Sequence, residues 1–167
     1  MSLNRSMDHI TSEDFERLAK HVEVEIADFL GSGKQTPFRE RQIAVVLCQG
    51  AALHYLDGSN GVKDFDVYVF FAELPGIKGP HNRSARKRDF GVSKFGRYSG
   101  DDALFSGRRI DIFWRTIPTE HRLDPAVAIP AYLRSGKPRS TPWHLSQKAV
   151  ILLRPKSRLG EVVWQPS

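Results

Sequence analysis

Asp64-Phe65-Asp66-Val67-Tyr68-Val69-Phe70-Phe71 is an apolar run that begins with two aspartates one residue apart. Its β-branched and aromatic residues favour a β-strand. Because side chains i and i+2 of a strand point to the same face, the carboxylates of Asp64 and Asp66 should project together. Charged groups among apolar neighbours are costly unless a partner neutralises them. The run therefore predicts a strand that carries two acids on one face and requires a cation beside them.

A third acid, Asp111, lies in a similar run farther along the chain, Arg109-Ile110-Asp111-Ile112-Phe113-Trp114. If the two runs form neighbouring strands, three carboxylates meet and repel one another. Hard divalent cations such as Mg²⁺ take oxygen ligands and relieve that repulsion. The pattern predicts a metal site made by the three acids. The alternative is that Asp111 forms a salt bridge with Arg108 or Arg109.

The segment before the first acid indicates an α/β unit. Residues 43–48 are continuously apolar, which is typical of a strand buried on both faces. Gln49-Gly50 predicts a turn, and residues 51–56 predict a short helix that ends at Asp57-Gly58. Free backbone N–H groups and the helix dipole attract phosphates to such a helix start. Whether the strands on either side of this helix run parallel or antiparallel does not follow from the pattern.

The remaining elements follow from periodicity and capping residues. An apolar stripe at helical spacing predicts a helix over residues 11–31. Pro130 should kink or divide a second helix, which begins at Asp124-Pro125. The other predicted elements are a helix over 141–147, strands over 149–153 and 161–164, and short strands at 90–92 and at Phe105.

The expected fold is α/β (α+β), with a small mixed sheet flanked by helices. A chain of 167 residues is the right size for one domain. We expect a single domain over 1–167, made of the N-terminal helix 11–31, a core motif region 43–117, and C-terminal helices and strands over 124–165.

The composition narrows the setting in which the protein acts. Its formal net charge of +6 and pI of about 9.7 favour a polyanionic partner, such as nucleotide phosphates or RNA, or serve solubility alone. The single cysteine, Cys48, excludes an intrachain disulfide and fits a reducing compartment. No apolar stretch approaches the roughly 20 residues needed to cross a bilayer. We therefore expect a cytoplasmic protein without a membrane partner.

Basic residues crowd the segment 78–97, which also carries glycines and aromatic residues. Such a segment is too polar for a core and too long for a simple connection, so it is a candidate functional loop. It could bind an RNA acceptor, with Phe90, Phe95 or Tyr98 stacking on bases. A solvated loop is the alternative. The candidate acceptor or phosphate contacts are Arg86, Lys87, Arg88 and Lys94.

The motif region resembles a known superfamily. Leu47-Cys48-Gln49-Gly50-Ala51 is followed after twelve residues by Asp64-Phe65-Asp66-Val67, and a later strand carries Ile110-Asp111-Ile112. This order is similar to the signature of the nucleotidyltransferases related to DNA polymerase β. Within them it is most similar to small bacterial members, including the AbiEii-like toxins. The resemblance covers roughly residues 43–115.

The resemblance implies transfer of a nucleotidyl group from a nucleoside triphosphate (NTP) to a hydroxyl acceptor. Asp64, Asp66 and Asp111 would be catalytic and would hold Mg²⁺ or Mn²⁺. Gln49, Gly50 and Ala51 would contact the phosphates.

Two residues depart from the family pattern. Ala51 stands where members often carry a hydroxyl residue, and Gln49 replaces a glycine of the small bacterial versions. A lost hydrogen bond to a charged group is worth roughly 1.5–3 kcal/mol, enough to weaken NTP binding without abolishing it. The alternative function is a catalytically silent module that binds RNA or a protein partner through the basic segment 78–97.

Overall fold

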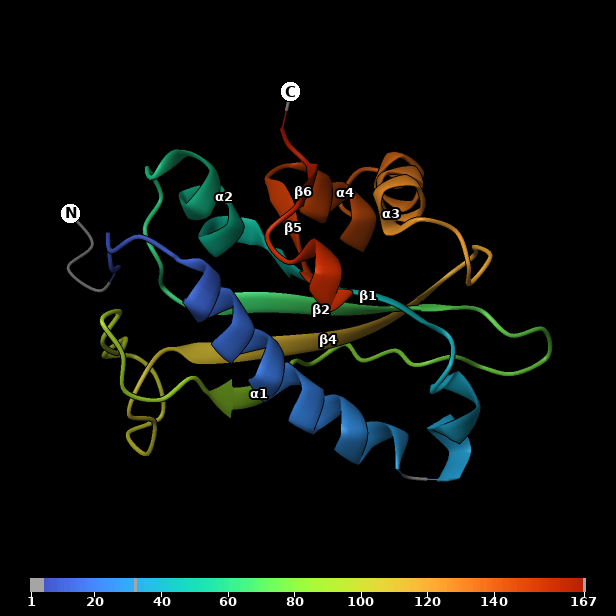
Figure 1. Cartoon of the computed structure of the whole chain (residues 1–167), viewed down its shortest axis with the longest axis horizontal. Coiled ribbons are helices and arrows are strands. Elements are labelled where there is room, and N and C mark those ends of the chain that lie inside the picture. The colour runs from blue at the N-terminus through green and yellow to red at the C-terminus, as the bar shows by residue number, and fades with distance from the viewer. Residues whose placement is uncertain (1–4, 32, 167) are drawn as a thin grey trace.

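A six-stranded mixed sheet forms the centre of the computed structural model, which describes residues 5–31 and 33–166 (Figure 1). The strand order is β3-β4-β2-β1-β5-β6. β2 and β4 are parallel, and every other neighbouring pair is antiparallel, so the two strands on either side of the short helix are antiparallel. The strands are β1 (Gln42–Cys48), β2 (Phe65–Ala72), β3 (Arg86–Asp89), β4 (Arg109–Ile117), β5 (Ala149–Arg154) and β6 (Val162–Trp164).

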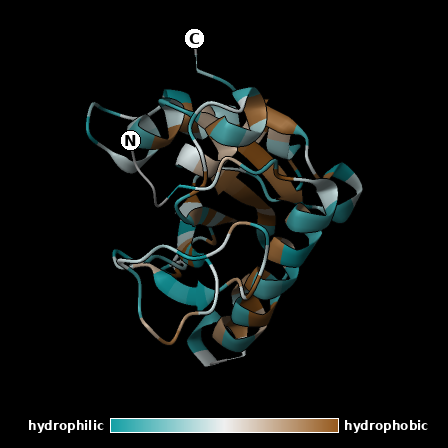
Figure 2. Cartoon of the chain, turned by 90° about the vertical axis from the view of Figure 1, so that its left-hand side faces the viewer, coloured by the Kyte–Doolittle hydropathy of each residue, from teal (hydrophilic) through white to brown (hydrophobic). Residues whose placement is uncertain are grey.

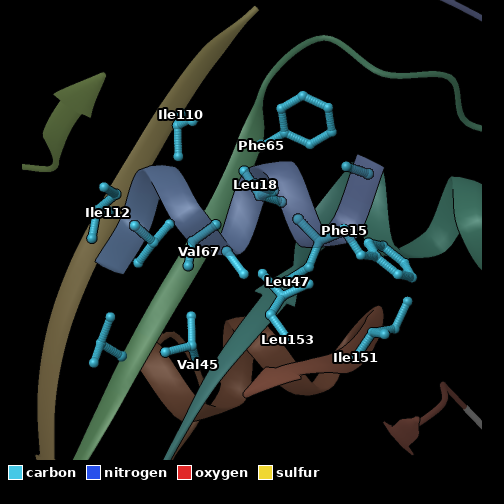
Figure 3. Close-up of a cluster of buried hydrophobic side chains, with 14 of the residues drawn as sticks. Phe15, Leu18, Val45, Leu47, Phe65, Val67, Ile110, Ile112, Ile151 and Leu153 are labelled. Carbon is cyan, nitrogen blue, oxygen red and sulfur yellow. The ribbon is translucent and has the colours of Figure 1, made fainter. Parts of the chain in front are cut away.

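One face of the sheet is covered by α1 (Ser12–Leu30), which crosses it diagonally (Figure 1). The helix begins with a capping box, in which Thr11 Oγ1 accepts the Asp14 N–H and the Asp14 carboxylate accepts the Thr11 N–H. Its apolar stripe, which includes Phe15 and Leu18, packs on alternate residues of the strands (Figure 3). The predicted N-terminal helix is therefore confirmed.

The opposite face carries α3 (Pro125–Arg134) and α4 (Thr141–Ser146), which close a second apolar cluster. Pro130 was expected to kink or divide this helix, and α3 continues through it without a break, so the helix is not divided. The proline is buried, and it cannot donate the backbone hydrogen bond that another residue would make in the helix. The shorter elements are α2 (Gln49–Asp57) and two 3₁₀ helices, Gly33–Phe38 and Lys156–Arg158.

Apolar residues gather between the helices and the sheet, and polar residues face outward (Figure 2). α1 is the longest helix of the described residues, and its outer face is polar apart from exposed residues such as Val24. Within the described ranges, no helix is both long enough and apolar enough to cross a membrane.

The segment between β3 and β4 differs most from the sequence prediction. The expected strands at 90–92 and at Phe105 are not formed, and residues 86–89 form β3 instead because they pair with β4. Phe90 and Phe95 are buried beneath α1 in the main core, so they cannot stack on bases. The Asp89 carboxylate accepts backbone N–H bonds from residues 91, 106 and 107 and closes this loop. A segment that looked polar in sequence thus contributes core side chains.

Candidate metal and nucleotide site

The three predicted acids come together at one end of the β2–β4 pair. Asp66 and Asp111 are register partners in the parallel ladder, and Asp64 immediately precedes β2. The neighbouring pair Phe65 and Ile110 points toward α1, so the aspartates lie on the other face of the sheet (Figure 3). One ligand atom from each aspartate lies within 4.8 Å of those of the others. The three carboxylates are therefore close enough to bind one metal ion.

Arg109 forms ion pairs with two of these acids. Its Nε and Nη2 donate to the two carboxylate oxygens of Asp111, at 2.8 and 3.0 Å. Nη2 also donates to Asp64 Oδ2 at 3.0 Å, and Nη1 donates to Asp101 Oδ1 at 2.6 Å. The salt bridge considered as the alternative for Asp111 is thus present, and the acid cluster exists alongside it. Arg108 points elsewhere, donating to the carbonyls of Phe95 and Lys63.

Asp66 has a different environment. Within residues 5–31 and 33–166 no group donates a hydrogen bond to its carboxylate or forms a salt bridge with it. Burial, followed by the charges of Asp64 and Asp111, raises the pKa of Asp66 to about 7. Burial and the charge of Asp111 also raise the pKa of Asp64. A bound cation would lower the pKa values of both Asp64 and Asp66, because it stabilises their charged forms. The cluster therefore favours cation binding.

The raised pKa predicts how pH changes the stability of the metal-free protein. An unfolded Asp66 loses its proton near its ordinary pKa of 3.8, whereas the folded one keeps it up to about pH 7. The native state therefore binds more protons between these values, and the contribution of Asp66 to the free energy of unfolding falls as pH rises through that window. We expect a loss of about 4 kcal/mol between pH 4 and pH 8, since each pKa unit corresponds to about 1.4 kcal/mol.

Urea denaturation in EDTA at several pH values tests this expectation. Other acids also change stability with pH, Asp64 in the same direction and Asp14 and Asp89 in the opposite one, so the quantity to compare is the difference between the wild type and Asp66→Asn. That difference should grow in favour of the variant from pH 4 to pH 7 and then level off. A difference that does not change with pH contradicts the prediction.

A cleft of about 320 Å³ opens beside the acids. Asp64 and Asp66 line it, together with the start of α2 at Gln49, Gly50 and Ala51. The predicted phosphate-binding turn and the first acid pair thus share one cavity. Asp111 is 7% exposed and is not among the described residues that line the cleft.

The backbone at the start of α2 has a conformation that few residues adopt. Gln49 has φ 61°, a left-handed conformation that favours glycine. A Cβ on Gly50 would lie 2.5 Å from Asn60 Nδ2, so a larger residue at this position would have to displace the Asn60 amide. The Asn60 Nδ2 atom is buried and has no hydrogen-bond partner among the described residues. Ala51 is 2% exposed and packs in the main core.

Most of the predicted basic contacts are engaged with α1. Arg86 pairs with Glu25 and Asp28, Arg88 pairs with Glu25, and Lys94 pairs with Asp14. Lys87 differs from them. It is the register partner of Asp111 on β3, so it is exposed on the face that carries the acids.

Sequence reasoning missed other residues of the cleft. The basic residues Arg5, Lys63 and Lys148 line it, as do Tyr68 and Phe113, whose rings stack with centroids 4.8 Å apart. Lys63 could have been noticed because it directly precedes Asp64. Lys148 could not, because it reaches the cleft only through the pairing of β5 with β1.

No protein-family model, curated protein or solved structure matches this chain. The functional assignment therefore depends on the residues of the cleft and on their geometry.

Proposed function

We propose that this chain is a magnesium-dependent nucleotidyltransferase that moves a nucleotidyl group from an NTP to a hydroxyl acceptor. The observation that carries the proposal is the shared cleft of the Gly50 turn and the acid pair, with Asp111 in register beside Asp66. A nucleotide site needs phosphate donors on one side and carboxylate ligands on the other, and this cleft offers both.

The acids fit a hard divalent ion, since they offer only oxygen ligands and two of them have raised pKa values. Mg²⁺, or Mn²⁺ in its place, would supply charge neutralisation at the transferred phosphate and activation of the acceptor hydroxyl. Asp64 and Asp66 would be its cleft-facing ligands. Asp111, which is buried, would be the third acid beside the ion.

The chain's own donors would position the triphosphate. Gln49, Gly50 and Ala51 at the start of α2 line the cleft, where the free backbone N–H groups of a helix start would bind phosphate, and Gly50 has no side chain to hold a phosphate away from the backbone. Lys63 and Lys148 add positive charge at the rim. The buried Asn60 amide beside Gly50 is a further donor that could replace the hydroxyl missing at Ala51.

The stacked rings of Tyr68 and Phe113 lie beside the acids and offer an aromatic surface to a nucleobase or to the acceptor. Lys87, exposed on the same sheet face, is the member of the basic segment best placed to contact an RNA or other acceptor. The cytoplasmic location expected from the sequence belongs to this same proposal.

Incubation of the protein with α-labelled NTPs, Mg²⁺ and candidate acceptors such as total RNA tests the proposal. We expect label to be transferred to an acceptor with release of pyrophosphate. The proposal fails if no NTP is turned over and calorimetry also detects no magnesium-dependent NTP binding.

A second function has one observation in its favour. Arg109 already neutralises part of the acid cluster, as it would in a catalytically silent module that binds RNA or a protein partner. A salt-sensitive RNA affinity that survives the double change Asp64→Ala and Asp66→Ala would favour this module. Loss of magnesium-dependent NTP binding in the same variant would favour the enzyme.

Lys148→Ala should raise the KM for NTP about tenfold with a smaller change in kcat. The lysine lines the cleft near Asp66, and a hydrogen bond to a charged phosphate is worth roughly 1.5–3 kcal/mol. Steady-state kinetics measures the change. Lys137→Ala, at an exposed lysine outside the cleft, is the matched control and should leave KM unchanged. Equal KM values in the two variants would remove Lys148 from the nucleotide site.

A further inference from the structure

We propose that Arg109 takes the place of one of the two divalent ions that a three-acid site can hold, so that this cleft binds a single ion. The inference rests on the proposed function and specifies its metal content. Three features support it: the hydrogen bonds of the guanidinium group, its anchoring by Asp101, and the charge of the cluster.

The guanidinium group occupies the ligand positions that a second ion would need. Arg109 engages both oxygens of Asp111 and one oxygen of Asp64, at 2.8–3.0 Å. A carboxylate held by a two-pronged arginine has fewer lone pairs left for a metal. The carboxylate of Asp66, by contrast, has no hydrogen-bond or salt-bridge partner among the described residues, and Asp66 lines the cleft.

Asp101 holds the guanidinium group in place from outside the three-acid cluster. It accepts Arg109 Nη1 at 2.6 Å, and its side chain is 1% exposed. Asp101 is not one of the three clustered aspartates. Arg109 could leave the cluster only if its contact with Asp101 also broke. Because the guanidinium is planar and permanently charged, it acts as a fixed cation in the site.

The charges also suit one ion. Four carboxylates surround the position, and the guanidinium groups of Arg109 and Arg108 both interact with members of this set. When the four acids are ionised, the two guanidinium groups and one divalent ion balance their charge. A second ion would add two positive charges to a partly buried place that Lys63 and Lys148 also border. Such an excess is unfavourable before any phosphate binds. The four carboxylates are those of Asp64, Asp66, Asp101 and Asp111.

The single ion would therefore belong to Asp64 and Asp66, at the side of the cleft shared with Gly50 and Lys148. That is the side on which the triphosphate would lie. Asp111 becomes a positioning residue, which holds Arg109 and thereby the charge balance next to Asp66.

Electron paramagnetic resonance of bound Mn²⁺ tests the inference on the full chain. Two Mn²⁺ ions about 3.5–4 Å apart couple magnetically, whereas one ion keeps a simple six-line spectrum. We expect the wild type to bind one Mn²⁺ per chain, uncoupled, with and without a non-hydrolysable ATP analogue. Arg109→Gln should bind two ions in the presence of the analogue and show a coupled spectrum.

Arg88→Gln is the matched control, because it removes an ion-paired arginine from the opposite face of the sheet and should keep one ion. A wild type that binds the analogue with two coupled ions overturns the inference and leaves the proposed function standing. A wild type that binds neither the analogue nor Mn²⁺ overturns both. The wild-type count decides the matter even if Arg109→Gln fails to fold.

Discussion

Asp66→Asn should lower the rate of magnesium-dependent nucleotidyl transfer by about three orders of magnitude. Asp66 is the cleft-facing acid without a salt-bridge or hydrogen-bond partner in the described chain, so its charge is free to bind the ion. A metal contributes several kcal/mol of charge stabilisation in such reactions, and each 1.4 kcal/mol corresponds to about tenfold in rate. Initial rates with labelled NTP at saturating Mg²⁺ measure the loss.

The same substitution should not damage the fold. Because burial and neighbouring acids disfavour the charge of Asp66, the metal-free variant should be more stable than the wild type at pH 8. Asp28→Asn, at an exposed aspartate of α1, is the control and should retain full activity. An active Asp66→Asn protein, or an inactive one that is also unfolded in EDTA, contradicts this account.

Arg109→Gln should lower the free energy of unfolding by about 3 kcal/mol in EDTA at pH 8. The change removes the cation shared by three carboxylates, and unpaired buried charges are strongly destabilising. Added Mn²⁺ should restore more stability to this variant than to the wild type, because an ion can replace the lost guanidinium.

Urea denaturation with and without Mn²⁺ measures both effects. Arg88→Gln breaks a more exposed ion pair with Glu25 and should cost less than about 1 kcal/mol. If the two variants are equally stable in EDTA, Arg109 is not the counter-charge of the acid cluster.

Much of the fold was predictable because its signals are local. The capping residues Thr11 or Ser12 and the apolar stripe behind them predicted a helix over 11–31, and α1 spans Ser12–Leu30. The runs around residues 43–48, 64–71 and 109–114 each became a strand. The predictions that were wrong concern residues whose structure depends on contacts with distant parts of the chain. Residues 86–89 form a strand only because β4 offers them an edge, and Phe90 is core only because α1 covers it.

The candidate site also has parts that the sequence predicted and parts that it did not. The two-residue spacing of Asp64 and Asp66 predicted that they share a face, and the glycine turn predicted a phosphate site nearby. The sequence suggested Arg109 only as one of two possible salt-bridge partners of Asp111. It did not predict that the Arg109 guanidinium group would contact three acids. Asp101, which also contacts Arg109, lies in the loop between β3 and β4, and a loop has no repeating pattern from which its path could be predicted.

The sequence by itself determined which side chains of each strand point together, because strand alternation depends only on neighbouring residues. Only the tertiary structure decided which strands stand side by side. The parallel register of Asp66 with Asp111, the cross-strand position of Lys87 and the arrival of Lys148 at the cleft all depend on strand order. Strand order follows from burying both sheet faces at once under α1, α3 and α4, and it places residues far apart in the chain beside one another.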